Sequence, residues 1–393
     1  MSVLLHRLNQ KLEERREQQL YRKRLNLDSP QGAEIQMGDK TLLNFSSNDY
    51  LGLANHPALI ARAKHSFEQF GFGAGASHLV CGHSDLHGEL ERRLAEFTAR
   101  DRALCFSSGF AANLAVQQVL LAKGDAVFHD RLNHASLLDG AQLSGARLLR
   151  FSHNDVSHLQ QRLNSTTAAG KLIAVDAVYS MDGDLAPLKR LADIAREDGA
   201  LLLADDAHGF AVLGEHGAGS AEYWGLSQDE LPILMGTLGK AMGSYGAFIA
   251  GSEALIEGLI QFARPYIYTT ALPPSVAAAS LAALDIVQGE PERRRKLMDL
   301  IAYFRARARD LGLPLMSSPT AIQPLLLGDA GLALDTANAL RKHGIFLAAI
   351  RPPTVPQNSA RLRITLTAAH ERAHVDHLLN MLDQNVPDSV RQQ

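Results

Sequence analysis

The chain has 393 residues, of which 46% are hydrophobic and 21% are charged. This composition is typical of a folded globular protein, and the length favours two packed units over a single core. The 39 lysines and arginines nearly balance the 42 acidic residues, which gives a net charge of −3. The sequence therefore lacks the strong basic field that nucleic-acid binding needs, and we expect no nucleic-acid partner.

The chain contains two cysteines, Cys81 and Cys105. Two distant cysteines build neither a thiolate metal cage nor a disulfide framework, and such low usage favours a reducing compartment. The charged N-terminal residues contain no apolar segment of the kind that secretory signals carry, and no apolar run approaches the ~18 residues that span a bilayer. We therefore predict a cytoplasmic protein without a membrane partner.

The N-terminal 24 residues predict an amphipathic helix. Leu4, Leu5, Leu8 and Leu12 recur at helical spacing among charged residues. The apolar stripe is short and the charge is mixed in sign, which favours a helix docked on the body over a helix at a membrane surface.

From about residue 100 onward, short apolar segments alternate with helical patterns. The helical patterns include residues 111–122 and 188–197. Alternation of buried strands with helices predicts an α/β fold with a parallel sheet covered on both faces. The predicted strands are Ala103–Phe106, Ala126–Phe128, Leu172–Val178, Leu201–Ala204 and Pro232–Met235.

A change of composition marks the predicted domain boundary. The apolar stretch Pro274–Val287 is followed by the charged run Glu290–Lys296. Beyond it, a helical pattern at residues 335–343 lies among three predicted strands, at residues 321–327, 345–349 and 362–366. We therefore predict an N-terminal helix and arm (residues 1–45), a large domain (46–288) and a smaller α/β C-terminal domain (289–393).

Three polar segments follow predicted strands, where the ligand crevice of a parallel sheet lies. In the first, Ser107, Ser108, Gly109 and Phe110 stand between a strand and a helix. Free N–H groups at a helix N-terminus suit a phosphate. An ordinary serine N-cap is the alternative interpretation.

The second segment carries Asp205, Asp206 and His208 directly after an apolar strand. A carboxylate at this position can hold a cationic ring nitrogen, and the histidine can hydrogen-bond the same ligand. A capping aspartate with a loop histidine is the simpler reading.

The third segment places Lys240 among Gly236, Gly239 and Gly243. Glycines allow close approach of other groups, so a lysine among them is partly desolvated. Desolvation favours the neutral amine, which is the nucleophilic form. An exposed structural lysine is the alternative.

Other patterns are weaker. Residues 71–76 match GxGxxG/A, but outside a strand–turn–helix unit, so a dinucleotide site is not favoured. His83 and His87 are four residues apart without an HExxH motif or cysteine support, and we predict no metal site. A GxSxG motif is absent from the sequence, which argues against an α/β-hydrolase.

Together, a phosphate-binding helix end, a strand-end aspartate, a nearby histidine and a glycine-flanked lysine meet the requirements of pyridoxal 5′-phosphate. At these residues the chain resembles the α-oxoamine synthases, a family of fold-type-I pyridoxal-phosphate enzymes, from about Leu42 to His370. The matching segments are Ser47–Leu53, Leu132–Ser136, Tyr179–Asp184, Asp205–Gly209 and Gly236–Lys240.

The resemblance implies roles for nine cofactor-binding residues. Lys240 is the Schiff-base lysine and moves the Cα proton, Asp205 pairs with the pyridinium nitrogen, and His134 stacks on the ring. The remaining members contact the ring substituents or the phosphate, and they are His208, Ser180, Thr237, Gly109, Phe110 and Thr270 or its neighbour Thr269, which reaches the phosphate of a partner subunit.

The resemblance also implies an acyltransferase with two substrates and a homodimer with shared active sites. Arg363 binds the amino-acid carboxylate, because a guanidinium holds a carboxylate through two hydrogen bonds. Arg22 and Thr354 face the acyl substrate, His134 contacts the bound substrate, and Asn48 lies at the site edge.

The resemblance to particular family members, which implies the substrates, lies in three segments: Ser180–Asp184 with Ala186–Leu188, Ala349–Pro356 and Arg361–His370. They are similar to those of family members that condense L-alanine with a pimeloyl thioester, carried on coenzyme A or acyl-carrier protein. A glycine-using synthase, an aminotransferase and a catalytically inactive member remain as alternatives, as does a non-enzymatic nucleotide-binding module. Asn358 and Ser359 replace the family's usual glycine turn, and we expect Asn358 to adopt the left-handed conformation.

Overall fold

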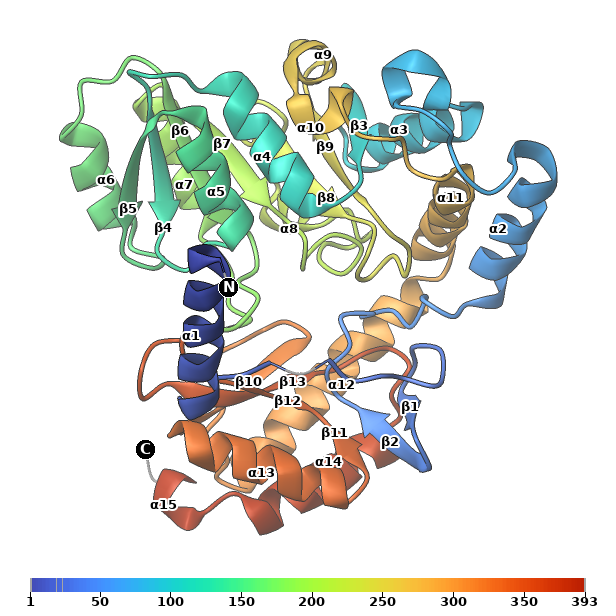
Figure 1. Ribbon diagram of the computed structural model, residues 1–393, viewed down its shortest axis with the longest axis vertical. Helices are drawn as coiled ribbons and strands as arrows, with labels where there is room; N and C mark the ends of the chain where they lie inside the picture. Colours follow the sequence, from blue (N-terminus) through green and yellow to red (C-terminus); the bar gives the residue numbers. More distant parts are fainter. Residues whose placement is uncertain (1, 19, 23, 392–393) are drawn as a thin grey trace.

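The structure, a computed structural model, describes residues 2–18, 20–22 and 24–391. Figure 1 shows two parts, one above the other, with helix α12 (Pro291–Asp310) leading from the upper part into the lower one. The upper part is built on a seven-stranded sheet and the lower part on two three-stranded sheets. The predicted division at residues 45 and 288 stays a prediction.

The seven-stranded sheet has the order β3-β9-β8-β7-β6-β4-β5. Its pairs are parallel except those of β9, which runs antiparallel to β3 and β8. This confirms the predicted mostly parallel sheet, although the predictions lacked β5 and β9. The strands are β3 (Arg102–Phe106), β4 (Ala126–Asp130), β5 (Arg147–Phe151), β6 (Lys171–Asp176), β7 (Leu201–Asp205), β8 (Ile233–Thr237) and β9 (Ala247–Gly251).

Helices cover both faces of this sheet (Figure 1). Successive strand residues point to opposite faces: Val127 packs in one hydrophobic cluster and Phe128 in another. Both faces of the sheet are therefore buried, which explains why the strand sequences are continuous apolar runs. One face carries α4 (Gly109–Leu120), α5 (Ala135–Ser144) and α9 (Glu253–Phe262); the other carries α6 (Val156–Asn164), α7 (Leu188–Glu197) and α8 (Ser220–Trp224).

Further helices lie beside the sheet and lead to the lower part. Helix α11 packs against α2 in Figure 1 and ends just before α12. The apolar stretch that preceded the predicted boundary is therefore one buried helix. The elements are α2 (Pro57–Phe70), the π-helix η1 (His78–Gly82), α3 (Asp85–Phe97), α10 (Arg264–Ile267) and α11 (Pro274–Gly289).

The lower part combines both ends of the chain. Strand β2 pairs in parallel with β11, so the N-terminal arm completes a sheet with C-terminal residues. The elements are β1 (Glu34–Met37), β2 (Lys40–Asn44), β10 (Ile322–Gly328), β11 (Ile345–Phe346), β12 (Ala348–Ile350), β13 (Ala360–Thr365), α13 (Ala330–Lys342), α14 (Arg372–Asn385) and α15 (Asp388–Arg391).

The prediction of one strand over residues 345–349 is wrong. The chain changes sheets at Leu347: β11 pairs with β2, whereas β12 pairs with β13. A run of apolar residues does not reveal such a change, because both short strands are apolar.

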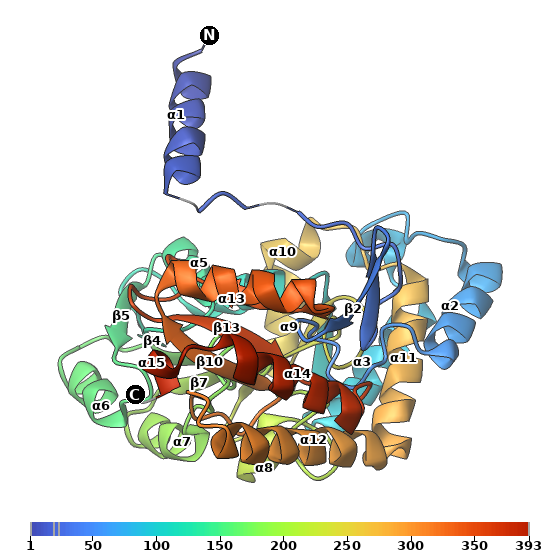
Figure 2. The ribbon, with the colours of Figure 1, turned by 90° about the horizontal axis from the view of Figure 1, so that it is seen from below.

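The N-terminal helix α1 (Val3–Glu17) stands away from the body in Figure 2. None of its residues is buried, and Leu4 and Leu5 are 70% and 55% exposed. The expectation that this helix docks on the body of its own chain is therefore wrong. Its leucine stripe is short, and the helix itself points away from the other elements. Among the described residues, no helix is both long and apolar enough to cross a membrane.

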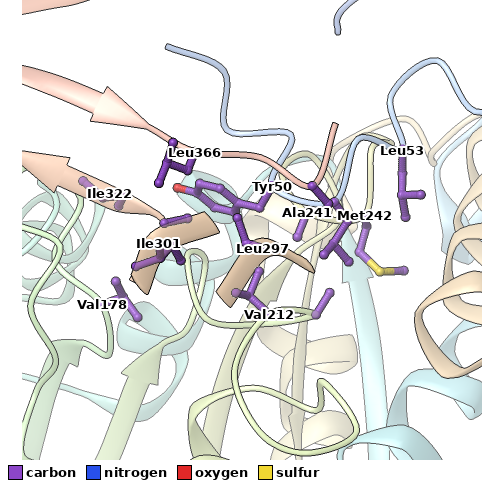
Figure 3. Packing of buried hydrophobic residues seen from close by; sticks show 14 of the residues in the cluster. Tyr50, Leu53, Val178, Val212, Ala241, Met242, Leu297, Ile301, Ile322 and Leu366 are labelled. Atoms are coloured by element: carbon purple, nitrogen blue, oxygen red, sulfur yellow. The ribbon is translucent and has the colours of Figure 1, made fainter. Parts of the chain in front are cut away.

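One hydrophobic core joins the upper and lower parts. Figure 3 shows side chains from the segment between β2 and α2, the loop after β8, α12 and the C-terminal strands packed together. These elements are far apart in the sequence, so the position of the loop after β8 depends on the whole fold. The labelled residues are Tyr50, Leu53, Val178, Val212, Ala241, Met242, Leu297, Ile301, Ile322 and Leu366.

Gly243 lets the loop after β8 lie against the segment between β2 and α2. Its φ is +62°, and a Cβ atom there would lie 2.4 Å from Leu53 C and Ala54 N. Only glycine meets both conditions without movement of the backbone.

We predict that Gly243→Ala lowers the free energy of unfolding by about 2–4 kcal/mol, from the left-handed backbone and the backbone clash together. Thermal unfolding measures the change. Gly239→Ala is the matched control, because a Cβ at that glycine has no neighbour closer than 3.7 Å. Equal destabilisation of both variants would contradict the argument.

Candidate active site

A cavity of about 200 Å³ lies at the carboxyl ends of β6, β7 and β8, beside the N-terminus of α4. Parallel strands place their carboxyl ends at one edge, which makes this edge the usual ligand site of such sheets. Eight predicted site residues line the cavity together: Gly109, Phe110, His134, Ser180, Asp205, His208, Thr237 and Lys240.

One end of the cavity is suited to a phosphate. Ser108 caps α4, because its Oγ accepts a hydrogen bond from Ala111 N at 3.1 Å, as the N-cap interpretation predicted. Gly109 and Phe110, the first residues of α4, line the cavity. The Thr237 hydroxyl lies on the same wall and donates to Gly246 O at 3.0 Å. A helix N-terminus and a hydroxyl thus meet where an anion would be stabilised.

The two adjacent aspartates have different surroundings. Asp205 lines the cavity, and its carboxylate accepts hydrogen bonds from Asn113 Nδ2 at 2.7 Å and Ala207 N at 3.0 Å. Asp206 points away and accepts from Ser220 N at 2.7 Å, while burial raises its pKa to about 7. Asp205 is therefore the carboxylate that can hold a cationic ring nitrogen. The sequence predictions did not identify Asn113 as a site residue.

Asp176 is a second cavity carboxylate that the sequence predictions missed. It pairs with Asp205 in the β6–β7 register, and its carboxylate accepts a hydrogen bond from His134 N at 3.1 Å. Burial and the neighbouring Asp205 charge raise its pKa. The predicted strand extended to Val178, which placed Asp176 in the interior of the strand. In the structure β6 ends at Asp176.

Lys240 begins a chain of polar side chains. Its Nζ lies 2.8 Å from His208 Nε2, and His208 Nδ1 lies 2.5 Å from the Tyr50 hydroxyl. Burial lowers the pKa of Lys240 to about 8, partly opposed by Asp205 and Asp176. Burial and the Lys240 charge lower the pKa of His208, whereas burial raises that of Tyr50. A neutral imidazole therefore links a protonated tyrosine to an amine that loses its proton easily.

Arg363 is buried beside this chain of side chains. Its guanidinium donates to Ser180 O at 2.6 Å, Asn48 Oδ1 at 3.1 Å and Thr365 Oγ1 at 3.0 Å. It pairs with no carboxylate of the described residues, so it can still bind a substrate carboxylate. Asn48 and Lys240 also line a neighbouring cavity of about 420 Å³, which places Lys240 between two cavities.

The other predicted substrate residues lie away from the cavity of their own chain. Arg22 is exposed on the N-terminal arm, and Thr354 is exposed in the loop before β13. Thr270 is also exposed, and it pairs with Ser77 in an isolated bridge. Their roles stay predictions. Asn358 has a φ of +58°, which confirms the expected left-handed turn.

The structure gathers three histidines near η1. One ligand atom from each of His78, His83 and His87 lies within 4.8 Å of the others. Both nitrogens of His87 are engaged: Nδ1 accepts from Ser84 N at 3.0 Å, and Nε2 lies 2.7 Å from Leu272 O. His78 and His83 face each other at 2.9 Å. The three imidazoles therefore form a hydrogen-bonded cluster. A metal ion bound by all three would replace some of these hydrogen bonds.

Comparison with known proteins first gives the class. Residues 40–382 match the family model of aminotransferase class I and II. A solved structure of SPT, a serine palmitoyltransferase, with pyridoxal phosphate is 29% identical with a TM-score of 0.92, covering 98% of each chain.

Two relatives indicate which group within this family the chain belongs to. The 8-amino-7-oxononanoate synthase of Cellvibrio japonicus is 58% identical, covering 95% of this chain and 94% of that protein. The solved 8-amino-7-oxononanoate synthase of Francisella tularensis is 33% identical with a TM-score of 0.78, covering 88% of this chain and 98% of that one. The chain therefore belongs to the aminotransferase class I and II family and, within it, to the 8-amino-7-oxononanoate synthases.

The cavity residues fit pyridoxal phosphate. The buried Asp205 carboxylate, held by Asn113, suits a pyridinium nitrogen. The start of α4 suits the phosphate, and Lys240 provides an amine of lowered pKa.

We predict that Asp205→Asn lowers kcat by at least about a hundredfold, because the amide cannot stabilise a ring cation electrostatically. Steady-state kinetics of the cofactor-loaded protein measure the loss. Asp206→Asn is the matched control and is expected to retain activity, since Asp206 faces Ser220. Comparable losses in both variants would show that Asp205 has no separate role.

The lowered Lys240 pKa predicts how cofactor uptake depends on pH. The neutral amine becomes dominant above about pH 8, not above the ordinary lysine value of about 10.4. The rate at which cofactor-free protein gains near-visible absorbance with pyridoxal phosphate should therefore reach half its maximum near pH 8. Lys240→Ala should gain no such band. A midpoint near pH 10 would refute the lowered pKa.

Proposed function

We propose that the chain condenses L-alanine with a pimeloyl thioester and releases carbon dioxide and the thiol, giving 8-amino-7-oxononanoate in biotin biosynthesis. Its cofactor is pyridoxal 5′-phosphate. The observation that carries the proposal is the position of Lys240, which lies in one cavity with Asp205 and His208. The proposal is also supported by the 58% identity to the synthase of Cellvibrio japonicus.

The side chains have separate tasks. Pyridoxal phosphate, when bound, supplies an electron sink for negative charge at the alanine Cα. Gly109, Phe110 and Thr237 would hold its phosphate, and Asp205 its ring nitrogen. His134, whose backbone N–H is fixed by Asp176, would cover the ring.

Lys240 moves the proton at the alanine Cα. Its pKa of about 8 lets the neutral amine accept that proton near neutral pH, and the same group can return it to the product. His208 at 2.8 Å and Tyr50 beyond it orient the amine. The alanine carboxylate, which leaves as carbon dioxide, binds Arg363, whose guanidinium is positioned by Ser180 and Asn48.

We further propose that the enzyme is a homodimer with shared active sites. Thr270 and Arg22 are exposed in their own chain, so a second copy could bring them to a cavity. Exposed apolar residues such as Tyr268 (72%) and Phe262 (70%) lie close to Thr270 in the sequence. Large exposed apolar side chains are typical of protein interfaces.

Turnover with defined substrates tests the function. We expect 8-amino-7-oxononanoate and carbon dioxide from L-alanine with pimeloyl-coenzyme A or pimeloyl-acyl-carrier protein, and much slower turnover of glycine. Near-visible absorbance titrated with L-alanine and glycine gives an independent reading of amino-acid choice. Preference for glycine would instead indicate a glycine-using α-oxoamine synthase. Absence of acyl transfer in protein that binds the cofactor would refute the proposal.

A further inference from the structure

A larger cavity lies apart from the site around Lys240. Its volume is about 650 Å³, and it shares no lining residue with the catalytic cavity. It lies between the end of α3, residues 215–226 and the junction of α11 with α12. Phe97, Ala221 and Leu226 give it an apolar wall, and its charged lining consists of four arginines and three glutamates. Its size is within the range of small-molecule sites.

The buried arginines of the described residues divide into two kinds. They are Arg100, Arg294, Arg361 and Arg363. Arg361 pairs with Asp182. Arg363 has no carboxylate partner and lies beside the catalytic cavity, where a substrate carboxylate is expected. Arg100 and Arg294 also pair with no carboxylate in the described part of the chain, and both line the larger cavity.

Backbone carbonyls meet only part of the hydrogen-bonding capacity of these two arginines. Arg294 donates to Val287 O and Glu215 O, which uses two of the five N–H groups of a guanidinium. Arg100 donates only to carbonyl groups, and its Nε, which is buried away from solvent, has no hydrogen-bond partner.

Burial lowers the pKa of both Arg100 and Arg294. The charges of Glu222 and Glu292 offset part of this effect at Arg294. Neither arginine has a carboxylate of the described residues in ion-pair contact, and an anion in the cavity would lower the remaining cost of burying the two cations.

The neighbouring acidic groups are largely engaged elsewhere. Glu222 accepts hydrogen bonds from His216 Nδ1 and Ala218 N, and Glu96 pairs with Arg92. Glu215 is exposed, and its backbone oxygen, not its carboxylate, contacts Arg294.

The remaining two arginines complete the charge balance. Arg93 is neutralised by Asp285. Arg295 is exposed on the cavity wall and adds a further positive charge beside Arg294. Three arginines without an ion-pair partner among the described residues therefore line the cavity with three glutamates, of which Glu96 and Glu222 have basic partners of their own.

We propose that this cavity binds a small organic anion, with its carboxylate or phosphate against Arg294, Arg100 and Arg295 and its apolar part against Phe97 and Leu226. The ligand would contact both α3 and the first turn of α12. Since α12 leads into the lower part of the molecule, the bound anion would tie the two parts together.

The test uses the cofactor-loaded enzyme, in which the catalytic phosphate site is filled. Sodium hexanoate and inorganic phosphate are titrated against sodium chloride at equal ionic strength, and the melting temperature is recorded. We expect a saturable rise of roughly a few degrees with at least one anion beyond the chloride series. A response to hexanoate assigns a carboxylate ligand, and a response to phosphate alone assigns a phosphate ligand.

Two exposed cavity residues supply the variants. Arg295→Glu and Gln288→Glu place a negative charge at the cavity, and each should remove at least half of the anion-dependent rise while leaving kcat unchanged. Arg190→Glu, an exposed change on α7 outside the cavity lining, is the control and should keep the full rise. No rise beyond chloride, or the same rise in all three variants, would overturn the proposal.

Discussion

The parallel pairing of β6, β7 and β8 brings the catalytic groups together. In this register Asp176 lies opposite Asp205, and Asp205 lies opposite Met235. Neighbouring strands are about 4.8 Å apart, so two carboxylates that end adjacent strands cannot avoid each other. Burial makes this repulsion strong, and a nearby cation relieves it. Among the described residues Lys240 is such a cation, and its own pKa reflects the opposing effects of burial and these two carboxylates.

The lower part of the molecule completes the site. Ser318 and Thr320 both donate to Gly183 O, at 2.8 and 2.9 Å, and Arg363 donates to Ser180 O. The loop after β6 is therefore held by C-terminal residues as well as by its own sheet. Tyr50 lies in the shared core of Figure 3 and also reaches His208, so the same packing that joins the parts orients the polar chain to Lys240.

Two cavities of this molecule lie beside buried arginines that form no ion pair with a carboxylate of the described residues. Arg363 lies beside the catalytic cavity, where its free capacity suits a substrate carboxylate. Arg100 and Arg294 lie in a larger cavity that no catalytic residue lines. Cavity volume alone would point to the wrong place for the chemistry, because the catalytic cavity is the smaller of the two. The kind of side chain, not the amount of space, identifies the reaction site.

The sequence by itself determined the parallel sheet, five of its strands and the residues that follow them. Short apolar runs followed by polar residues are local signals, and parallel strands place their carboxyl ends at one edge. This is why Gly109, Asp205, His208 and Lys240 were predicted as one site. The left-handed turn at Asn358 was also local, since it depends on one residue type.

Only the tertiary structure decided which of Asp205 and Asp206 faces the cavity, because adjacent strand-end residues differ in direction and not in chemistry. It also revealed Asn113, Asp176 and Tyr50, whose partners are distant in the sequence: Tyr50 and His208 are 158 residues apart. The division of residues 345–349 between two sheets and the undocked α1 depend likewise on where other segments lie. Local patterns specify elements and chemical groups, whereas contacts between distant segments follow from packing of the whole chain.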